Sequence, residues 1–152
     1  MNNKEKNQCH LIEMAHLGFS ADSIAFVGKL CAWITENPAD MKQLESFILG
    51  LCEETRDNNS DPELYLARVD EQSSWLYDVE HGCYDDKGLY EKRITFHVCA
   101  ESFGDEESII DLELEYISNY RLADNLETVE NSIYCLSYES HNGLIQTFKL
   151  PV

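Results

Sequence analysis

The stretch IIDLELEYI at residues 109–117 alternates apolar and acidic side chains almost residue by residue. A period of two is typical of a β-strand with one buried and one solvated face. Similar alternation occurs in Arg93–Glu101 and in Ser132–Glu139, and further strands are expected at Trp75–Glu80 and Leu144–Leu150. These segments predict an antiparallel sheet of about four or five strands.

Turn signals separate these segments. Ser140-His-Asn-Gly143 ends in Asn-Gly, a pair typical of a tight β-hairpin. We expect further turns at His81-Gly82 and at Asp85–Gly88. Strands and helices do not alternate along the chain, which disfavours a parallel nucleotide-binding sheet.

Residues 1–60 instead follow a helical period. Helices are predicted from Cys9 to Gly18, from the N-cap Ser20 to Asn37, and from Asp40 through the apolar stripe that ends near Cys52.

The next segment allows two predictions. Asp61-Pro62-Glu63 is typical of a helix start, and a fourth helix over residues 64–76 is the first expectation. A strand over Leu64–Asp70 is the alternative.

We therefore predict one α+β domain over residues 1–152, with a helical part at 1–60 and a mainly antiparallel sheet at 75–152. Three or four helices precede the sheet. The six cysteines are widely dispersed, which favours free thiols over a disulfide framework. The polar N-terminus and the absence of a long apolar run predict a cytoplasmic protein, as a monomer or homodimer.

The charge is strongly negative and uneven. The formal net charge is −18, with nine acids and five bases in residues 1–60 and twenty acids and six bases in residues 61–152. Such a chain repels nucleic acid and anionic membranes, so neither is expected as a direct ligand. A basic protein surface is the expected partner.

Ten acids between Glu101 and Glu130 form the predicted partner-binding surface, opposed within this stretch by Arg121 alone. Those on the predicted strand share one face at a spacing of about 6.7 Å, comparable to that of phosphates along a nucleic-acid strand. An ordinary solvated sheet face is the alternative interpretation. The ten are Glu101, Asp105, Glu106, Glu107, Asp111, Glu113, Glu115, Asp124, Glu127 and Glu130.

A weaker pattern concerns metal binding. His81-x-Cys83 and His97-x-Cys99 could supply a tetrahedral zinc site if the two pairs lay on adjacent strands. The spacing differs from that of common zinc motifs, so we expect no resident cofactor, with zinc as the alternative.

No catalytic motif is present in the sequence, and a non-enzymatic role is expected. The composition favours a small acidic inhibitor that imitates nucleic acid, of the kind by which a phage or mobile element blocks an anti-viral defence complex (anti-CRISPR or anti-restriction). An immunity protein, an antitoxin or an effector chaperone with a cationic partner is the alternative. A zinc-binding module or enzyme is a third possibility.

Overall fold

The computed structural model contains three helices followed by five strands. It describes residues 1–37, 40–79, 83–123 and 126–151, and for residues 75–79, 83–89, 122–123, 126–128 and 130 it describes the backbone alone. The helices are α1 (Asn3–Leu17), α2 (Ala21–Glu36) and α3 (Met41–Asp57). The predicted helical layer is confirmed.

The helix ends follow from local chemistry. Gly18 ends α1 at φ +93°, a left-handed conformation that glycine adopts without strain. Ser20 caps α2 by accepting a hydrogen bond from the Ser23 amide, and Asp40 caps α3 through the amides of Lys42 and Gln43. Three helix boundaries, namely the end of α1 and the starts of α2 and α3, are therefore predicted by single capping residues.

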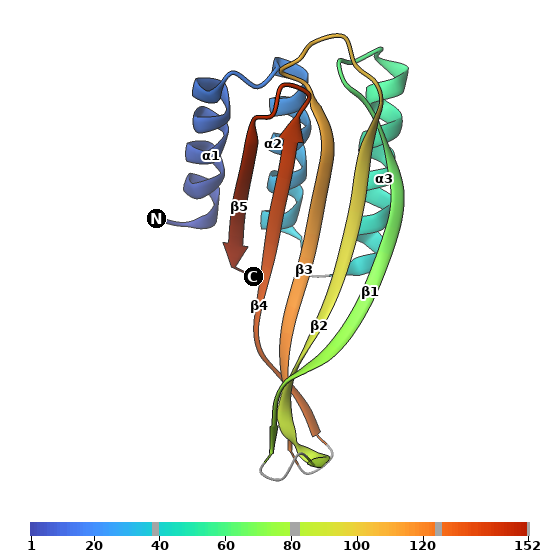
Figure 1. Cartoon of the computed structure of the whole chain (residues 1–152). Coiled ribbons are helices and arrows are strands. Elements are labelled where there is room, and N and C mark those ends of the chain that lie inside the picture. The colour runs from blue at the N-terminus through green and yellow to red at the C-terminus, as the bar shows by residue number, and fades with distance from the viewer. Residues whose placement is uncertain (38–39, 80–82, 124–125, 152) are drawn as a thin grey trace.

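The strands form one antiparallel meander in the order β1-β2-β3-β4-β5 (Figure 1). Each strand pairs only with its neighbours in the sequence, which confirms the predicted sheet. The bounds are β1 (Glu63–Val79), β2 (Cys83–Ser102), β3 (Ile109–Ala123), β4 (Leu126–Ser140) and β5 (Ile145–Pro151). The predicted hairpin at residues 140–143 joins β4 to β5, with Gly143 at φ +89°.

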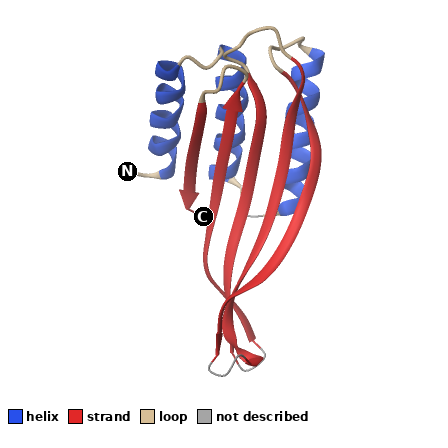
Figure 2. Ribbon diagram, in the orientation of Figure 1, coloured by secondary structure: helices blue, strands red, loops and turns tan. Residues whose placement is uncertain are grey.

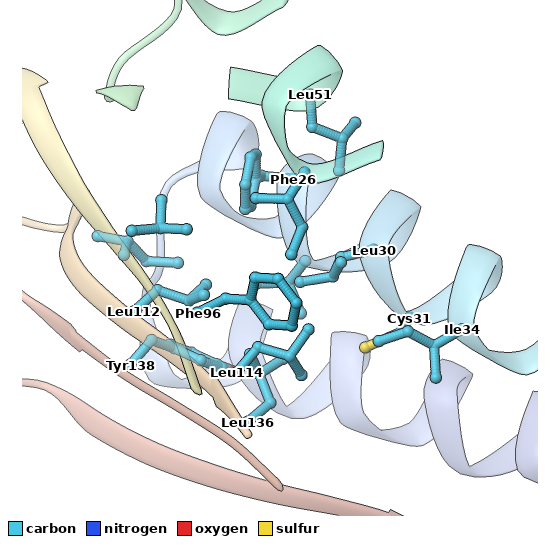
Figure 3. Packing of buried hydrophobic residues seen from close by; sticks show 14 of the residues in the cluster. Phe26, Leu30, Cys31, Ile34, Leu51, Phe96, Leu112, Leu114, Leu136 and Tyr138 are labelled. Carbon is cyan, nitrogen blue, oxygen red and sulfur yellow. The ribbon is translucent and has the colours of Figure 1, made fainter. Parts of the chain in front are cut away.

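All three helices cover the same face of the sheet (Figure 2). The core lies between the two layers, where Phe96 and Leu114 of the sheet meet Phe26 and Leu30 of α2 (Figure 3). These four side chains are at most 3% exposed. None of the described helices covers the opposite face of the sheet, which we call the open face.

The strands extend well beyond the helices. A strand of 17 residues such as β1 is about 56 Å long, whereas a helix of 17 residues such as α3 is about 26 Å long. Figure 2 shows the ends of β1 to β4 twisting together below the helical layer. No helix in the described part of the chain has the length and apolar character needed to cross a membrane.

Two local predictions were wrong. Residues 64–76 belong to strand β1 and not to a fourth helix, so the alternative prediction of a strand holds there. A register shift between Leu66 and Arg68 inserts one residue into the alternation. The inward side chains Leu64, Leu66 and Val69 therefore include a step of three that imitates a helical period.

The second error concerns Asp85–Gly88, which was expected to form a turn. These residues lie inside β2, where Gly88 pairs with Asp78 of β1 and with Leu122 of β3. Residues 84–87 fall within a register shift, since Cys83 pairs with Val79 and Gly88 with Asp78, yet the backbone there is extended and forms no turn between strands. The other expected turn, His81-Gly82, lies outside the described residues.

Candidate partner-binding surface

Strand β3 places Asp111, Glu113 and Glu115 on the open face. Leu112 and Leu114, which alternate with them, are buried against the helices. The acidic side chains therefore share one face, as expected, at intervals of about 6.7 Å.

Side chains of the neighbouring strand β2 pair with two of these acids. The Arg93 guanidinium of β2 lies 2.8 Å from Glu115 and 3.1 Å from Glu91. Its pKa is raised, first by the hydrogen bond to Glu91. The His97 ring lies 3.2 Å from Glu113 and 3.0 Å from Asp70. The middle of the open face therefore carries mixed charge, unlike a nucleic-acid backbone.

Asp111 differs from the other two strand acids. Its cross-strand partner on β4 is Glu139, and both side chains are exposed. Like charges directly opposite each other on a sheet destabilise it. Neither carboxylate forms an ion pair with a described residue.

A shallow hollow of about 230 Å³ lies beside this pair. Asp111, Glu113 and Glu139 border it together with Ser137 and the exposed Ile145 of β5. We call it the acidic hollow. Glu139 was absent from the predicted surface, although the alternation of Ser132–Glu139 places it on the same face as Asp111 once the register is known.

The loop between β2 and β3 carries the next group of acids. Asp105, Glu106 and Glu107 are exposed there, and Glu101 is exposed near the end of β2. None of the four forms an ion pair within the part of the chain that the structure describes. They continue the acidic surface from the top of β3 across the end of the molecule.

Asp61 fixes the conformation of this loop. Its carboxylate accepts hydrogen bonds from the amides of Gly104 and Asp105 at 2.7 and 2.8 Å, and from the Ser108 hydroxyl at 3.0 Å. The proximity of Asp61 raises the pKa of Asp105, with smaller contributions from desolvation and from Glu107. The negative potential at this end is therefore high enough to affect proton binding.

Neighbouring loops attach to the same segment through the backbone. The Ser20 amide donates to the Glu107 carbonyl at 3.1 Å, and the Asn142 amide donates to the Glu106 carbonyl at 3.0 Å. The side chains of Glu106 and Glu107 are exposed. The loop is thus held by its main chain while these carboxylates point toward solvent.

Two more of the predicted acids lie at the other end of the sheet. Glu127 and Glu130 belong to β4, about 40 Å and 30 Å along the strand from the position that pairs with Asp111. Asp124 lies outside the described residues. The ten predicted residues therefore do not form one continuous surface.

Comparison with protein-family models gives no match, and neither a curated protein nor a solved structure matches the chain.

The described residues do not show the arrangement that the alternative zinc site would need. Cys83, His97 and Cys99 all belong to β2, and their partners on β1 place Cys83 about 36 Å from His97 along the sheet. The two His-x-Cys motifs are thus not brought together on adjacent strands, and His81 lies outside the described residues. Among the described residues, no three histidine, cysteine or acidic side chains are grouped as metal ligands would be.

The described cysteines are free thiols, namely Cys9, Cys31, Cys52, Cys99 and Cys135. Burial raises the pKa of Cys31 to about 12 and that of Cys52 to about 11. Burial also raises the pKa of Cys99, and the nearby Asp111 adds to the effect. These three thiols are therefore protonated near neutral pH and are poor nucleophiles.

Proposed function

We propose that this chain is a small non-enzymatic inhibitor that binds a basic protein surface in the cytoplasm. The observation that carries the proposal is the exposed acidic surface formed by Asp105, Glu106, Glu107, Asp111 and Glu139, which has no ion-pairing cation among the described residues. A cationic partner would relieve the repulsion among these carboxylates. Opposite charge would also accelerate association.

The most specific form of this proposal is nucleic-acid mimicry. The target would be a protein or complex that normally binds nucleic acid, such as a phage-directed defence system. Three features support it. They are the net charge of −18, the regular spacing of the β3 acids, and the loop between β2 and β3, whose exposed acids continue the negative surface beyond the start of β3. The mechanism would be competitive occlusion of a basic groove.

A second candidate is an immunity protein, antitoxin or chaperone with one dedicated cationic partner. The ion pair Arg93–Glu115 favours it, because it interrupts the acidic ladder with positive charge. The contact between His97 and Glu113 also engages the ladder within the protein. A surface of mixed charge suits recognition of one specific partner better than imitation of a uniform polyanion.

The test is capture of partners from a lysate by tagged protein at low and high salt, with and without added DNA or RNA. Mimicry predicts a nucleic-acid-binding protein that added nucleic acid displaces. A dedicated partner that nucleic acid leaves in place would support the second candidate. A purified complex then permits affinity measurement.

Variants locate the surface. Reversing two exposed loop acids, Glu106→Lys with Glu107→Lys, is expected to weaken binding at least tenfold, because both side chains face solvent. The matched control is Glu53→Lys with Asp57→Lys, which makes the same charge change at exposed positions of α3. Equal losses in the two double variants would show that only net charge matters and would refute this surface.

A further inference from the structure

Strand β5 is an edge strand whose outer side pairs with no other strand in the described part of the chain. It comprises seven residues, Ile145–Pro151. In Figure 1, helix α1 lies beyond this edge, on the side of the sheet that the helices cover. The helix overhangs the position that a sixth strand would occupy.

Contacts at two points hold α1 in this position. His10 stacks on Phe148 of β5 with ring centroids 4.2 Å apart, and its Nε2 lies 2.6 Å from the Tyr138 hydroxyl. At the first residue of α1, the Asn3 side-chain amide donates to the carbonyl of Pro151, the last residue of β5, at 3.1 Å. The relation between the helix and the sheet edge is therefore fixed by specific contacts.

A hollow of about 200 Å³ separates α1 from β5. Lys6, Cys9 and Glu13 border it on the helix, and Thr147 and Phe148 border it on the strand. A groove between a sheet edge and a helix is a common binding site for extended peptides, because the edge supplies backbone hydrogen bonds.

The acidic hollow lies on the opposite side of the same strand. Ile145, which is 69% exposed, borders it and pairs with Glu139, which in turn pairs with Asp111. Successive side chains of a strand point to opposite faces of the sheet. A segment added beside β5 would thus direct alternate side chains toward the α1 groove and toward the acidic hollow.

We propose that an extended basic segment of the partner protein adds to the sheet as a sixth strand beside β5. Its arginine or lysine side chains would cross Ile145 on the open face and pair with Glu139, the nearer member of the like-charged pair Asp111 and Glu139. Its alternate side chains would fill the groove beneath α1. The proposal rests on the proposed function, since it takes the partner to be cationic.

Lys149 determines where the basic residues of the segment lie. It also projects from the open face of β5, four residues from Ile145, or about 13 Å along the strand. A basic side chain opposite Lys149 is repelled, whereas one opposite Ile145 approaches the Glu139 carboxylate. The favoured register therefore places the positive charge of the segment at the Ile145 end.

The probe is a fluorescein-labelled octapeptide that alternates arginine and valine. Binding is measured by anisotropy, and backbone hydrogen exchange is followed in the full-length protein. We expect slower exchange of amides within residues 145–151 when the peptide is bound, because strand addition places the peptide backbone against them. The control is the same peptide with its two central residues replaced by proline. It cannot form the strand pairing, and we expect it to leave the exchange of the β5 amides unchanged.

Charge variants provide the second measurement. Asp111→Lys with Glu139→Lys is expected to reduce peptide affinity at least tenfold, and Glu53→Lys with Asp57→Lys serves as the control of equal charge. Both acids of the first variant are exposed, so the substitutions leave the core intact. Equal affinities of the two variants would overturn the proposal.

Two further results would also overturn it. The first is peptide binding without protection of β5, which indicates attraction by the acidic loops alone and leaves the proposed function intact. The second is a dimer in sedimentation experiments with β5 already protected, because a second copy then occupies the edge. Conversely, protection of β5 by the peptide combined with capture of no basic protein would contradict the proposed function alone.

Discussion

Asp61 joins segments that are distant in the sequence. It accepts from two amides and one hydroxyl of the β2–β3 loop, while its own amide donates to the Asp22 carboxylate at 2.8 Å. Helix α2, the start of β1 and the acidic loop are thus connected through one residue. Hydrogen bonds from main-chain amides to a carboxylate are among the stronger ones in proteins.

Removing this side chain should therefore destabilise the fold. We expect Asp61→Ala to lower the free energy of unfolding by about 2 kcal/mol, because it leaves the loop amides without their charged acceptor. Urea denaturation followed by circular dichroism measures the change. Asp57→Ala removes an exposed acid of α3 and is the control. Similar small changes in both variants would mean that the loop is held without Asp61.

The role of Asp61 could not be predicted from the sequence. Asp61-Pro62-Glu63 was interpreted as a helix start, and a carboxylate that organises a loop 43 residues away leaves no local pattern. Glu139 could not be predicted as part of the acidic surface for a related reason, since it joins that surface only through its cross-strand neighbour Asp111. Residue type and local period predict the face of a side chain but not its partner on another strand.

At the scale of elements, the attachment of α1 to the sheet is sensitive to pH. His10 is 4% exposed between α1, β4 and β5. Desolvation lowers its pKa, and the acid Glu13 only partly offsets the effect. Between this lowered pKa and the ordinary value near 6.5, the unfolded chain binds a proton that the folded chain does not. Acid therefore favours unfolding in this range.

The native protein should consequently lose stability, relative to His10→Gln, as the pH falls from 7.5 to 5.5. Glutamine can bond to the Tyr138 hydroxyl but does not titrate. Urea unfolding at both pH values, in 0.5 M NaCl to screen the other charges, gives the four free energies required. A difference between the two proteins that stays constant with pH would show that His10 titrates alike in both states.

The elements differ in how well the sequence predicted them. Helices α2 and α3 and strand β3 have strong periodic patterns and clear caps or turns, and their prediction is confirmed. Strand β1 contains a bulge that shifts its period, and in β2 the turn-forming residues 85–88 lie in an extended segment at a register shift. Pairing between strands decides such cases, and it is invisible in a local window.

For the molecule as a whole, the net charge of −18 opposes compaction. The chain has few basic residues to offset this charge, and some of them form ion pairs at the surface. In the pair Lys29–Glu54 the side chains are 53% and 46% exposed. Pairs this exposed contribute little to stability. The long-range repulsion among carboxylates is therefore the larger effect of charge on folding.

Salt should accordingly stabilise the protein. We expect the melting temperature to rise by several degrees between 20 mM and 500 mM NaCl, since the screening length falls from more than 20 Å to less than 5 Å. Differential scanning calorimetry measures this shift. A melting temperature that decreases with salt would mean that attractive ion pairs outweigh the repulsion. Binding to a basic partner should show the opposite dependence and weaken in high salt.

Because each strand pairs only with its neighbours in the sequence, the length by which the sheet projects beyond the helices can change through short insertions or deletions. Beyond the helices β1 pairs with β2 and β3 with β4, and the two members of each pair are consecutive in the chain, so deleting two residues from each arm shortens a pair by about 7 Å and keeps every remaining side chain on its original face. Inserting two residues into each arm lengthens the pair of strands by the same amount. Evolution can thus change how far the sheet projects without altering the helical layer, the core or the order of the strands.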